Sequence, residues 1–465
     1  MKKALLVLVG FVCLFSLYGG AQVPRSRHVW IVGEENHSFE DAAGSMPYLM
    51  SLGEQYGIAT QYYADMHNSI SALMHLTAGQ TVTTDDSTPK TFDVDNIVRQ
   101  LLRKGLSFRS YQEQLPQAGF LGLWSGPYVK RHNPLAYFTD VANSNLRNDI
   151  VPIQQLASDL ANHAAANYNY VTPDLNHDAH DGSLRVADEW LHQYLPPILA
   201  QPEFQPGGDG LLFVVFDEGN LGSNIDFRCN ASSSSPDCGG RVLVVVAGPN
   251  VKPGFQSPTF YNHESLLATV CQALGTDSCP GAAVNAAPIR DVFVTPLSAS
   301  PGTGSARAGQ PARFSLRVEP VSGFYNSNVK FSCAKLPPNV KCSFFPATVQ
   351  SGSGGGNTTL TISVPPSSWA RLPPFGRRTG SELALWLGLP GLALLSGGGA
   401  KRKSWLVVAA PAVLTAVVLC FGCGGGAAPP TNAAVTTRQQ TYTVNVVAQS
   451  SSASYSVPVQ LRVTN

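Results

Sequence analysis

Between Arg27 and Phe293, short apolar runs alternate with segments whose apolar residues recur at helical spacing. The apolar runs are of strand length and rich in β-branched and aromatic residues: His28–Val32, Asn167–Val171, Leu211–Phe216 and Val242–Ala247. The amphipathic segments are Asp93–Lys104, Ile153–His163, Leu184–Ala200 and Glu264–Leu274. Strands that alternate with helices, some of them apolar throughout, predict an α/β domain with a mainly parallel sheet covered on both faces.

The pattern changes near Thr295. Residues 298–366 are rich in Ser, Gly, Pro and Thr, and apolar residues alternate with polar ones along several short segments. These segments are Ala312–Val318, Val329–Ser332 and Thr358–Val364, and two similar ones follow near the end of the chain, Gln440–Val447 and Tyr455–Val463. Alternation of period two predicts strands with one buried face, so we expect a small β-sandwich that the last strands complete.

Two apolar segments interrupt this β-rich region, at residues 383–395 and 405–421. The second has about 17 residues, which is marginal for a membrane span, and the basic triplet Lys401-Arg402-Lys403 separates the two. A membrane-attached tail is the favoured interpretation, and a buried hydrophobic insertion is the alternative.

The first 21 residues are typical of a secretory signal peptide. Lys2 and Lys3 precede an apolar stretch from Ala4 to Tyr18, and small residues at 19–21 offer a cleavage site before Gln22. The alternative, an uncleaved membrane anchor, fits less well because the apolar stretch is shorter than a full span. We therefore expect an exported protein, whether periplasmic, cell-surface or secreted.

The two regions also differ in charge. Residues 22–295 carry 15 Lys and Arg against 28 Asp and Glu, a net charge of −13, and residues 296–465 carry 14 against 2, a net charge of +12. The overall share of charged residues, 13%, is about half that of ordinary soluble proteins, which excludes a coiled coil, a charge-driven disordered protein and a histone-like nucleic-acid binder. All ten histidines precede residue 264, so we expect the chemistry in the first region.

These observations divide the 465 residues into five predicted parts. They are a signal peptide at 1–21, a catalytic domain at 22–295, the first part of a β-sandwich at 296–370, a Gly- and Pro-rich linker with the two apolar segments at 371–428, and C-terminal strands at 429–465. Six cysteines fall in close pairs that predict local disulfides: Cys229/Cys238, Cys271/Cys279 and Cys333/Cys342. Zinc is the alternative, but the single C-x-x-C, Cys420/Cys423, has no second pair of ligands nearby.

Polar side chains follow three of the predicted strands. Glu35 and Asn36 come after the first strand, Asp178 and His180 after the second, and Asp217 and Glu218 after the third. Because ligands of open α/β sheets bind beyond the carboxyl ends of the strands, we expect these groups at one edge. Carboxylates gathered there would raise one another's pKa unless a cation neutralised them, which predicts a divalent metal held by oxygen ligands. For any one cluster, helix-capping acids in a turn are the alternative.

Ser69 is the nucleophile candidate, because it lies where a loop enters a predicted short helix. The free backbone N–H groups and the dipole of a helix N-terminus favour an anion such as a phosphoryl group or an alkoxide. A plain N-cap serine is the alternative. The sequence has no G-x-S-x-G motif, so an α/β-hydrolase finds no support.

Four ordered motifs resemble the phosphoesterase family of the alkaline-phosphatase-like superfamily, which includes acid phosphatases and phospholipases C. The motifs are Glu35-Asn36-His37-Ser38-Phe39, the Ser69 segment ending in Leu76-Thr77-Ala78-Gly79, Asp178-Ala179-His180-Asp181 and Phe216-Asp217-Glu218-Gly219. The resemblance covers Arg27 to about Phe293 and implies an alkaline-phosphatase-like α/β/α sandwich. Residues 298–366 resemble the bacterial Ig-like repeats that are appended to exported enzymes.

By position, the resemblance implies a metal site, a nucleophile and two histidines near the phosphate. The metal ligands would be Glu35, Asn36, Ser69, Asp217 and Glu218, where Glu218 stands in place of an Asp found in some relatives. Ser69 matches the nucleophile, and His132 and His180 match the catalytic histidines. Asp178 and His263 are additional candidates, and His263 has the alternative role of capping the helix that follows it.

The implied function is an exported, metal-dependent, acid-phosphatase-like phosphoesterase. Its divalent metal would lower the pKa of the Ser69 hydroxyl, Ser69 would form a phosphoserine intermediate, and a histidine would protonate the leaving oxygen. The substrate would be a small phosphate ester or a phospholipid, and no nucleic-acid partner is expected. One alternative is a phospholipase C-type phosphodiesterase. An alternative of another class is a non-catalytic cell-surface binding protein.

Overall fold

The computed structural model describes residues 22–219, residues 239–366 without positions 322–324, 326 and 353, and residues 439–464 without positions 452 and 453. The predicted signal peptide, the pair Cys229/Cys238, Cys420/Cys423 and both apolar segments lie outside these residues. None of the helices in the described part combines the length and the apolar content that a membrane crossing needs.

One large sheet forms the centre of the first domain. Its strands follow the order β11 (Phe255–Asn262), β2 (Gly57–Ala64), β10 (Val244–Ala247), β8 (Leu211–Phe216), β1 (Val29–Glu34), β7 (Tyr168–Thr172), β3 (Phe108–Gln112) and β6 (Ile150–Pro152), and β9 (Gly240–Arg241) pairs with β2. Neighbouring strands run parallel except around β10, which is antiparallel to β2 and to β8, and β9, which is antiparallel to β2. The predicted α/β class with a mainly parallel sheet is confirmed.

The central strands are apolar along their whole length because both faces of the sheet are covered. Every residue of β1 and of β8 is buried, as expected for a parallel sheet with helices on both sides. The edge strand β11 leaves five of its eight residues exposed or partly exposed and carries polar side chains. The hydrophobic pattern therefore predicts β1, β7, β8 and β10, and it misses β2, β3, β6 and β11.

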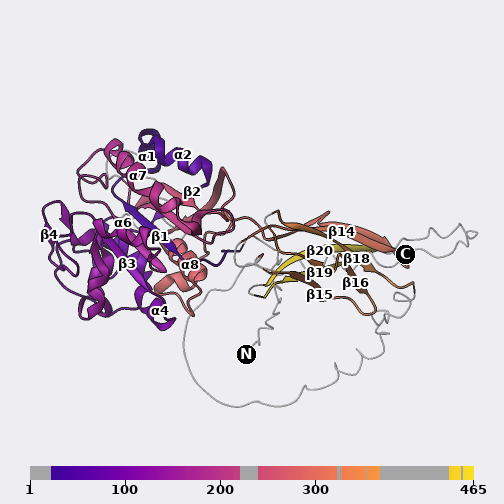
Figure 1. The fold of residues 1–465 in the computed structure, drawn as a ribbon. Coiled ribbons are helices and arrows are strands. Elements are labelled where there is room, and N and C mark those ends of the chain that lie inside the picture. The colour runs from indigo at the N-terminus through magenta and orange to yellow at the C-terminus, as the bar shows by residue number, and fades with distance from the viewer. Residues whose placement is uncertain are drawn as a thin grey trace, which may run out of the picture.

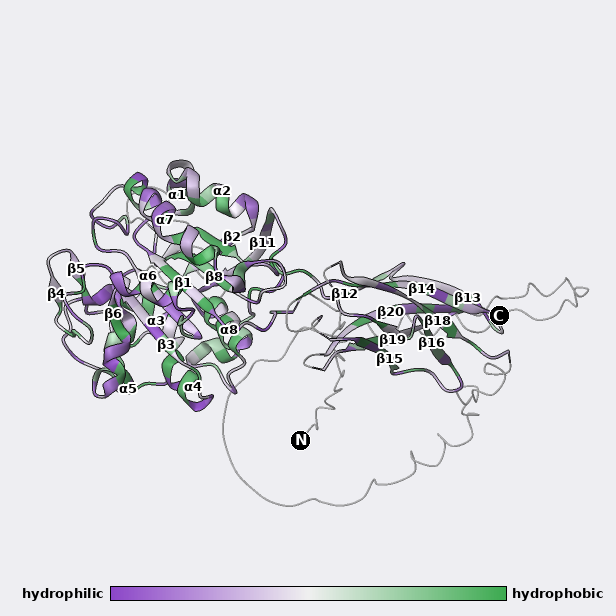
Figure 2. Cartoon of the chain, viewed as in Figure 1, coloured by the Kyte–Doolittle hydropathy of each residue, from purple (hydrophilic) through white to green (hydrophobic). Residues whose placement is uncertain are grey.

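Helices cover both faces of this sheet (Figure 1). On one face α1 (Phe39–Ser45), α2 (Pro47–Gln55) and α7 (Leu184–Leu199) pack together, and on the other face α3 (Ser69–Ala78) packs against α8 (His263–Leu274). The remaining helices are α4 (Ile97–Arg103), α5 (Thr139–Ala142) and α6 (Gln154–Ala161), and β4 (Trp124–Ser125) pairs with β5 (Tyr128–Val129) in a small hairpin. Figure 2 shows the hydrophobic strands enclosed by these helices.

A second core lies between two sheets of the C-terminal region. One has the order β12 (Leu297–Ser300), β14 (Pro311–Val318), β18 (Gly356–Ser363) and β16 (Lys341–Phe345), and the other β13 (Thr303–Arg307), β20 (Ser454–Thr464), β19 (Gln439–Gln449), β15 (Val329–Ala334) and β17 (Thr348–Val349). Along β14 buried and exposed residues alternate, which is the period of a strand with one face in a core. Strands from both sheets contribute to one hydrophobic cluster. The Ig-like identity of this region stays a prediction.

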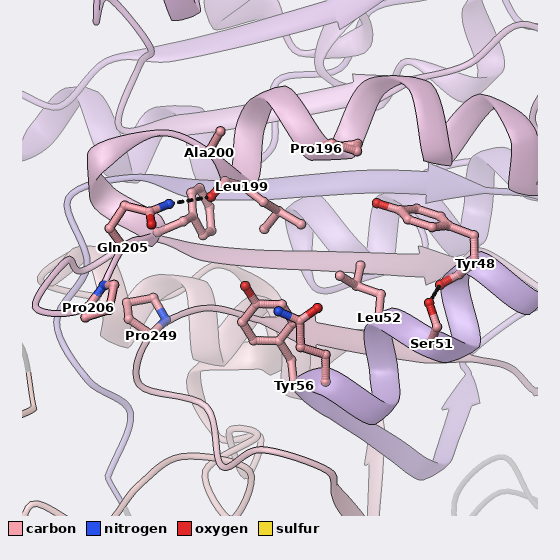
Figure 3. A pocket seen from close by; sticks show the side chains of 12 residues that line it. Tyr48, Ser51, Leu52, Tyr56, Pro196, Leu199, Ala200, Gln205, Pro206 and Pro249 are labelled. Carbon is pink, nitrogen blue, oxygen red and sulfur yellow. Dashed lines mark hydrogen bonds between the residues drawn. The ribbon is translucent and has the colours of Figure 1, made fainter.

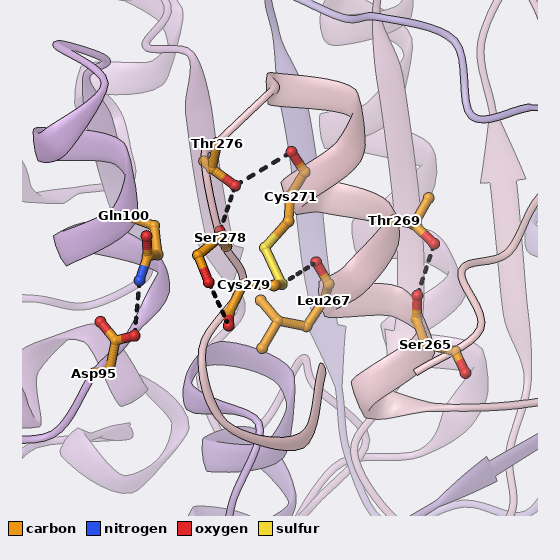
Figure 4. The surroundings of a disulfide bond; sticks show 9 residues. All are labelled: Asp95, Gln100, Ser265, Leu267, Thr269, Cys271, Thr276, Ser278 and Cys279. Carbon is orange, nitrogen blue, oxygen red and sulfur yellow. Dashed lines mark hydrogen bonds between the residues drawn. A yellow bond between two sulfur atoms is a disulfide. The ribbon is translucent and has the colours of Figure 1, made fainter. Parts of the chain in front are cut away.

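Local disulfides are confirmed for the two cysteine pairs in the described part. Cys271 of α8 is bonded to Cys279 in the loop that follows the helix (Figure 4). Cys333 and Cys342 join β15 to β16, which are consecutive in the chain but belong to opposite sheets. This bond therefore links the two sheets, because the chain crosses from one sheet to the other between the two cysteines.

The N-terminus of α8 is held by Asp65, which directly follows β2. Asn262 caps the helix by accepting a hydrogen bond from the Ser265 backbone N–H (2.9 Å), so His263 does not have the capping role. Asp65 in turn accepts from Asn262 Nδ2 (2.7 Å) and from the His263 backbone N–H (3.0 Å). Burial raises the pKa of Asp65 to about 6.

Replacing Cys271 and Cys279 with alanine should lower the free energy of unfolding of the first domain by about 2–3 kcal/mol. The bond closes a short loop, and its removal returns the corresponding entropy to the unfolded chain. Urea titrations followed by helical circular dichroism would measure the change. Cys333→Ala/Cys342→Ala is the control, because that bond lies in the β-sandwich and should leave this transition in place. An unchanged midpoint in the first variant would contradict the prediction.

Asp65→Asn should flatten the pH dependence of stability between about pH 4 and pH 6. Folded Asp65 keeps its proton up to about pH 6, whereas an unfolded Asp loses it near 3.9, so the folded state binds the extra proton in this window. Its contribution is full below about pH 4 and is lost as the pH rises through 6, a change of about 3 kcal/mol. Unfolding free energies of both proteins at pH 4 and 6 would check this. Equal pH dependence would refute it.

Candidate active site

The residues that follow six strands of the large sheet lie at the same edge. β11, β2, β8, β1, β7 and β3 all run in one direction, so their carboxyl ends lie side by side. The residues brought to this edge include Glu35, Asp178, Asp217 and Glu218 after the strands, Ser69 at the start of α3, and His132 in the turn Lys130–His132 after β5. All six side chains are buried.

A continuous chain of contacts links four of these residues. Ser69 Oγ donates a hydrogen bond to Glu35 Oε2 at 2.9 Å. The other oxygen of Glu35, Oε1, lies 3.3 Å from His132 Nε2. On the far side of the ring, His132 Nδ1 donates to Asp178 Oδ2 at 2.8 Å. Ser69, Glu35, His132 and Asp178 therefore form one line of polar groups through the buried edge.

Asp217 and Glu218 bind the backbone around that line. Asp217 Oδ1 accepts from the backbone N–H of Asn36 (3.1 Å) and from that of Glu218 (2.6 Å). Glu218 Oε2 accepts from the Asn68 backbone N–H and from His67 Nδ1, both at 2.7 Å. The two acids thus connect the residues after β1 and β8 with the turn that carries the nucleophile candidate.

His180 lies next to His132 but is more accessible. The two ring centroids are 5.5 Å apart, and 26% of the His180 side chain is exposed against 2% for His132. Arg131 Nη2 donates to His180 Nε2 at 3.2 Å, so the Nδ1–H of this ring donates to Asp181 at 2.8 Å. His180 is therefore the imidazole that faces outward from the site.

His263, the second additional candidate, holds the backbone of a site residue in place. Its ring lies between Tyr62 Oη, 2.9 Å from Nδ1, and the backbone oxygen of Asp217, 2.6 Å from Nε2. Burial lowers the pKa of His263 to about 3, so the ring is neutral. It donates from Nε2 and accepts from the Tyr62 hydroxyl, which fixes the backbone at Asp217.

Burial and like charges shift the titration of the central groups. The pKa of Glu35 is raised by burial and then by the charges of Asp217 and Asp178, and the pKa of Asp217 is raised by burial and by Glu218. Burial also raises the pKa of Asp178 to about 7, and burial together with Arg131 lowers that of His132 well below its usual value. The acidic side chains of the site are therefore not all neutralised by the basic side chains beside them.

Three turns at this edge have a strained backbone. Asn36, Asn68 and Ala179 have φ values of 55°, 91° and 72°, in the left-handed region that residues with a Cβ rarely adopt. Each is next to a predicted site residue, namely Glu35, Ser69 and the pair Asp178 and His180. Such conformations persist where the surrounding contacts hold them, and they concentrate at functional sites.

Two compact groups of metal-ligating side chains occur in the described part, and neither is the predicted ligand set. Their members are Asp65, His75 and Glu264 in one group and Glu113, Asp174 and His177 in the other, with ligand atoms within 4.8 Å of one another. Both groups lie at the same edge and are linked by their own hydrogen bonds and ion pairs. The carboxylates Glu35, Asp217 and Glu218 are arranged more openly.

A surface hollow of about 660 Å³ lies elsewhere, between α2 and α7 (Figure 3). Tyr48, Tyr56 and Leu199 are among its lining residues, and none of the predicted site residues is. Pro206 precedes β8 and Pro249 follows the antiparallel β10, so the hollow opens at the opposite edge of the sheet.

The sequence pattern misses Arg131, Asn68 and Asp86 as members of the site. Arg131 is next to His132 in a segment without helical or strand periodicity. Asp86 lies in the long connection between α3 and α4, and its carboxylate binds residues on both sides of Ser69. None of these three residues directly follows a predicted strand, which is the signal that identifies the acids.

Comparison with known proteins places the first domain. The sequence profile described as "Phosphoesterase family" matches residues 45–276. Glu35 and Asn36 precede this range, and the other predicted site residues lie inside it.

Among curated proteins, the chain is similar to a probable acid phosphatase of Kluyveromyces lactis, with 31% identity over 256 residues, or 52% of this chain and 57% of that protein. A phosphate-repressible acid phosphatase of Penicillium chrysogenum is 30% identical over 267 residues, 56% of this chain and 61% of that protein. The chain thus spans about six tenths of the length of these relatives. A phosphatidylinositol-3-phosphatase of Mycobacterium tuberculosis is 28% identical over 275 residues, 58% of this chain and 84% of that protein.

Solved structures give a more distant likeness. A lipoteichoic acid synthase LtaP from Listeria monocytogenes matches with a TM-score of 0.41 and 11% identity, covering 61% of this chain and 86% of that one. A protein of the alkaline phosphatase superfamily from Vibrio parahaemolyticus matches with a TM-score of 0.37 and 12% identity, covering 73% and 80%. Through its first domain, which the family profile and the curated relatives match, this chain belongs to the phosphoesterase family.

Proposed function

We propose that the chain is an exported, metal-dependent phosphoesterase that hydrolyses phosphate monoesters with Ser69 as its nucleophile. The observation that carries this proposal is the buried line of contacts from Ser69 Oγ through Glu35 and His132 to Asp178. The relatives named as acid phosphatases and as a phosphatidylinositol-3-phosphatase support a monoester substrate, either small or part of a lipid head group.

Export is supported by two features of the chain. Residues 1–21 have the pattern of a signal peptide, and two disulfides form within the described residues. Structural disulfides persist in oxidising compartments and are rare in the cytosol.

The side chains at the edge of the sheet fit a divalent cation. Glu35, Asp217 and Glu218 are buried together, and Asp217 Oδ2 has no hydrogen-bond partner among the described residues. Carboxylate, amide and hydroxyl oxygens are the donors that hard cations prefer. The ligands would be Glu35, Asn36, Ser69, Asp217 and Glu218. When bound, the cation would supply Lewis-acid stabilisation of negative charge on oxygen.

Ser69 is oriented for attack on phosphorus. Its hydroxyl donates to Glu35 Oε2, so this carboxylate directs the hydroxyl and is placed to accept the proton of the nucleophile. Ser69 is also the first residue of α3, where the helix dipole favours the negative charge of a phosphoryl group. Attack expels the alcohol and leaves a phosphoserine, which water then hydrolyses.

His180 is the better placed of the two histidines to protonate the leaving oxygen. His132 is buried, with one nitrogen on Asp178 and the other facing Glu35. His180 is more exposed, and Asp181 accepts from its Nδ1, which leaves Nε2, the nitrogen beside Arg131, to carry the proton for the leaving oxygen. We therefore assign the leaving-group proton to His180 and the orientation of Glu35 to His132.

Ser69→Ala should lower kcat for p-nitrophenyl phosphate by at least about 1,000-fold, because the covalent step loses its nucleophile. The full-length wild type and the variant would be assayed with and without a chelator, and chelation should abolish the activity of the wild type until a divalent cation is restored. A p-nitrophenyl phosphorylcholine assay in parallel separates monoester from diester hydrolysis.

Ser71→Ala is the matched control for this experiment. Ser71 lies two residues further along α3, is fully buried, and its hydroxyl has no hydrogen-bond partner in the described part of the chain. It should keep wild-type activity. Comparable turnover by Ser69→Ala and the wild type would refute the proposal, and a preference for the diester would favour the phospholipase C-type alternative.

His180→Ala should discriminate between leaving groups. Glycerol phosphate expels an alkoxide that needs a proton, so kcat should fall by about 100- to 10,000-fold. p-Nitrophenolate leaves without a proton, so its phosphate ester should lose less than about 10-fold. The control is His177→Ala, whose ring pairs with Glu113 and Asp174 away from the Ser69 line. Equal losses on both substrates would exclude His180 as the general acid.

A further inference from the structure

The turn before the nucleophile candidate does not have the conformation of an ordinary helix N-terminus. Asn68 is the N-cap residue of α3, yet its φ of 91° and ψ of 112° are far from the extended values that N-cap residues adopt. Its side chain makes no capping hydrogen bond to the helix. A conformation of this kind is strained, so other contacts must hold it.

Asp86 supplies the missing cap from outside the helix. Asp86 Oδ1 accepts from the Ile70 backbone N–H at 3.1 Å, which is a donor that an N-cap side chain normally satisfies. The second oxygen, Oδ2, accepts from Asn68 Nδ2 at 2.7 Å. One half-buried carboxylate thus binds the residue before Ser69 and the residue after it.

Asn68 is also held from its other side. Its backbone N–H donates to Glu218 Oε2 at 2.7 Å, so the turn is fixed between Glu218 after β8 and Asp86 in the α3–α4 connection. The Asn68 side chain is a natural N-cap group. Without Asp86 it would be free to return to extended backbone values and cap α3 itself, and that relaxation would relieve the strain.

We propose that Asp86 is a positioning residue that holds Ser69 in its attacking orientation by clamping Asn68 and Ile70. This inference rests on the proposed function of Ser69 as nucleophile. Asp86 contacts the two residues that flank Ser69 and not Ser69 itself, so it acts through the backbone. Release of the clamp lets the turn relax, and the Ser69 hydroxyl moves from its place 2.9 Å from Glu35.

Asp86→Ala in the full-length, metal-loaded protein tests the clamp. Misplacement of a reacting group by about 1 Å costs about 100-fold, so kcat for p-nitrophenyl phosphate should fall by about that factor while KM changes by less than about threefold. Asp86→Asn keeps an oxygen that can accept one of the two hydrogen bonds, and it should recover at least about 10-fold of the lost kcat.

The matched control is Asp85→Ala. This neighbour is also an aspartate, and its hydrogen bonds to Thr83, Ser87 and Thr88 stay within its own loop. Its kcat should remain within about twofold of the wild type. An equal loss in Asp85→Ala and Asp86→Ala would show an effect of loop charge and overturn the proposal, as would an Asp86→Ala protein with unchanged kcat.

The same substitution made in an Asn68→Gly protein separates a positioning role of Asp86 from a role in folding. Glycine at position 68 tolerates a positive φ and has no side chain to recapture the helix end, so Asp86→Ala should cost less than about 10-fold in Asn68→Gly. The full 100-fold loss in that background would overturn the mechanism. Titration of active sites by the burst of p-nitrophenol corrects every kcat for unfolded protein, and a loss that vanishes on this correction would mean that Asp86 only stabilises the fold.

The result for Ser69→Ala distinguishes a failure of the proposed function from a failure of the positioning role. If Ser69→Ala retains activity, the proposed function fails whatever Asp86 does. If Ser69→Ala is inactive and Asp86→Ala turns over normally, the positioning role alone is wrong.

Discussion

The site depends on a concentration of buried acid that this sheet edge must neutralise. Two unit charges about 4 Å apart repel by about 4 kcal/mol at an effective dielectric constant of 20, and burial adds the cost of lost hydration. Glu35, Asp178 and Asp217 accordingly have raised pKa values, and Asp217 keeps one oxygen without a partner among the described residues.

The same acids hold the strained turns around them. Asp217 binds the N–H of Asn36, Glu218 binds the N–H of Asn68, and Asp178 binds the N–H of His180, which follows the left-handed Ala179. Electrostatics and backbone geometry are therefore coupled at this edge. A change that neutralises or removes one acid alters the local charge and also releases a turn, so activity losses here cannot be assigned to charge alone without a matched neighbour.

The parts that sequence pattern predicts are those with a repeated physical signal. β1, β7 and β8 are buried on both faces, and the polar residues after them are predicted at one edge because parallel strands share a direction. The reversed direction of β10 leaves no mark in a fully apolar run, and β11 carries too many polar residues to show a core face. Asp86 and Arg131 escape prediction because they lie in connections, where position is set by tertiary contacts and not by periodicity.

In helix α3, the contacts that stabilise the fold differ from those that orient Ser69, although they lie only a few residues apart. All ten of its residues are buried, so packing against α8 fixes the helix as a body. The first turn, however, begins at a left-handed Asn68 and not at the extended residue of an ordinary cap, a choice that apolar packing alone does not explain. The choice is made by carboxylates from two distant segments, Asp86 and Glu218. The core therefore determines where Ser69 lies, and the surrounding acids determine the direction of its hydroxyl.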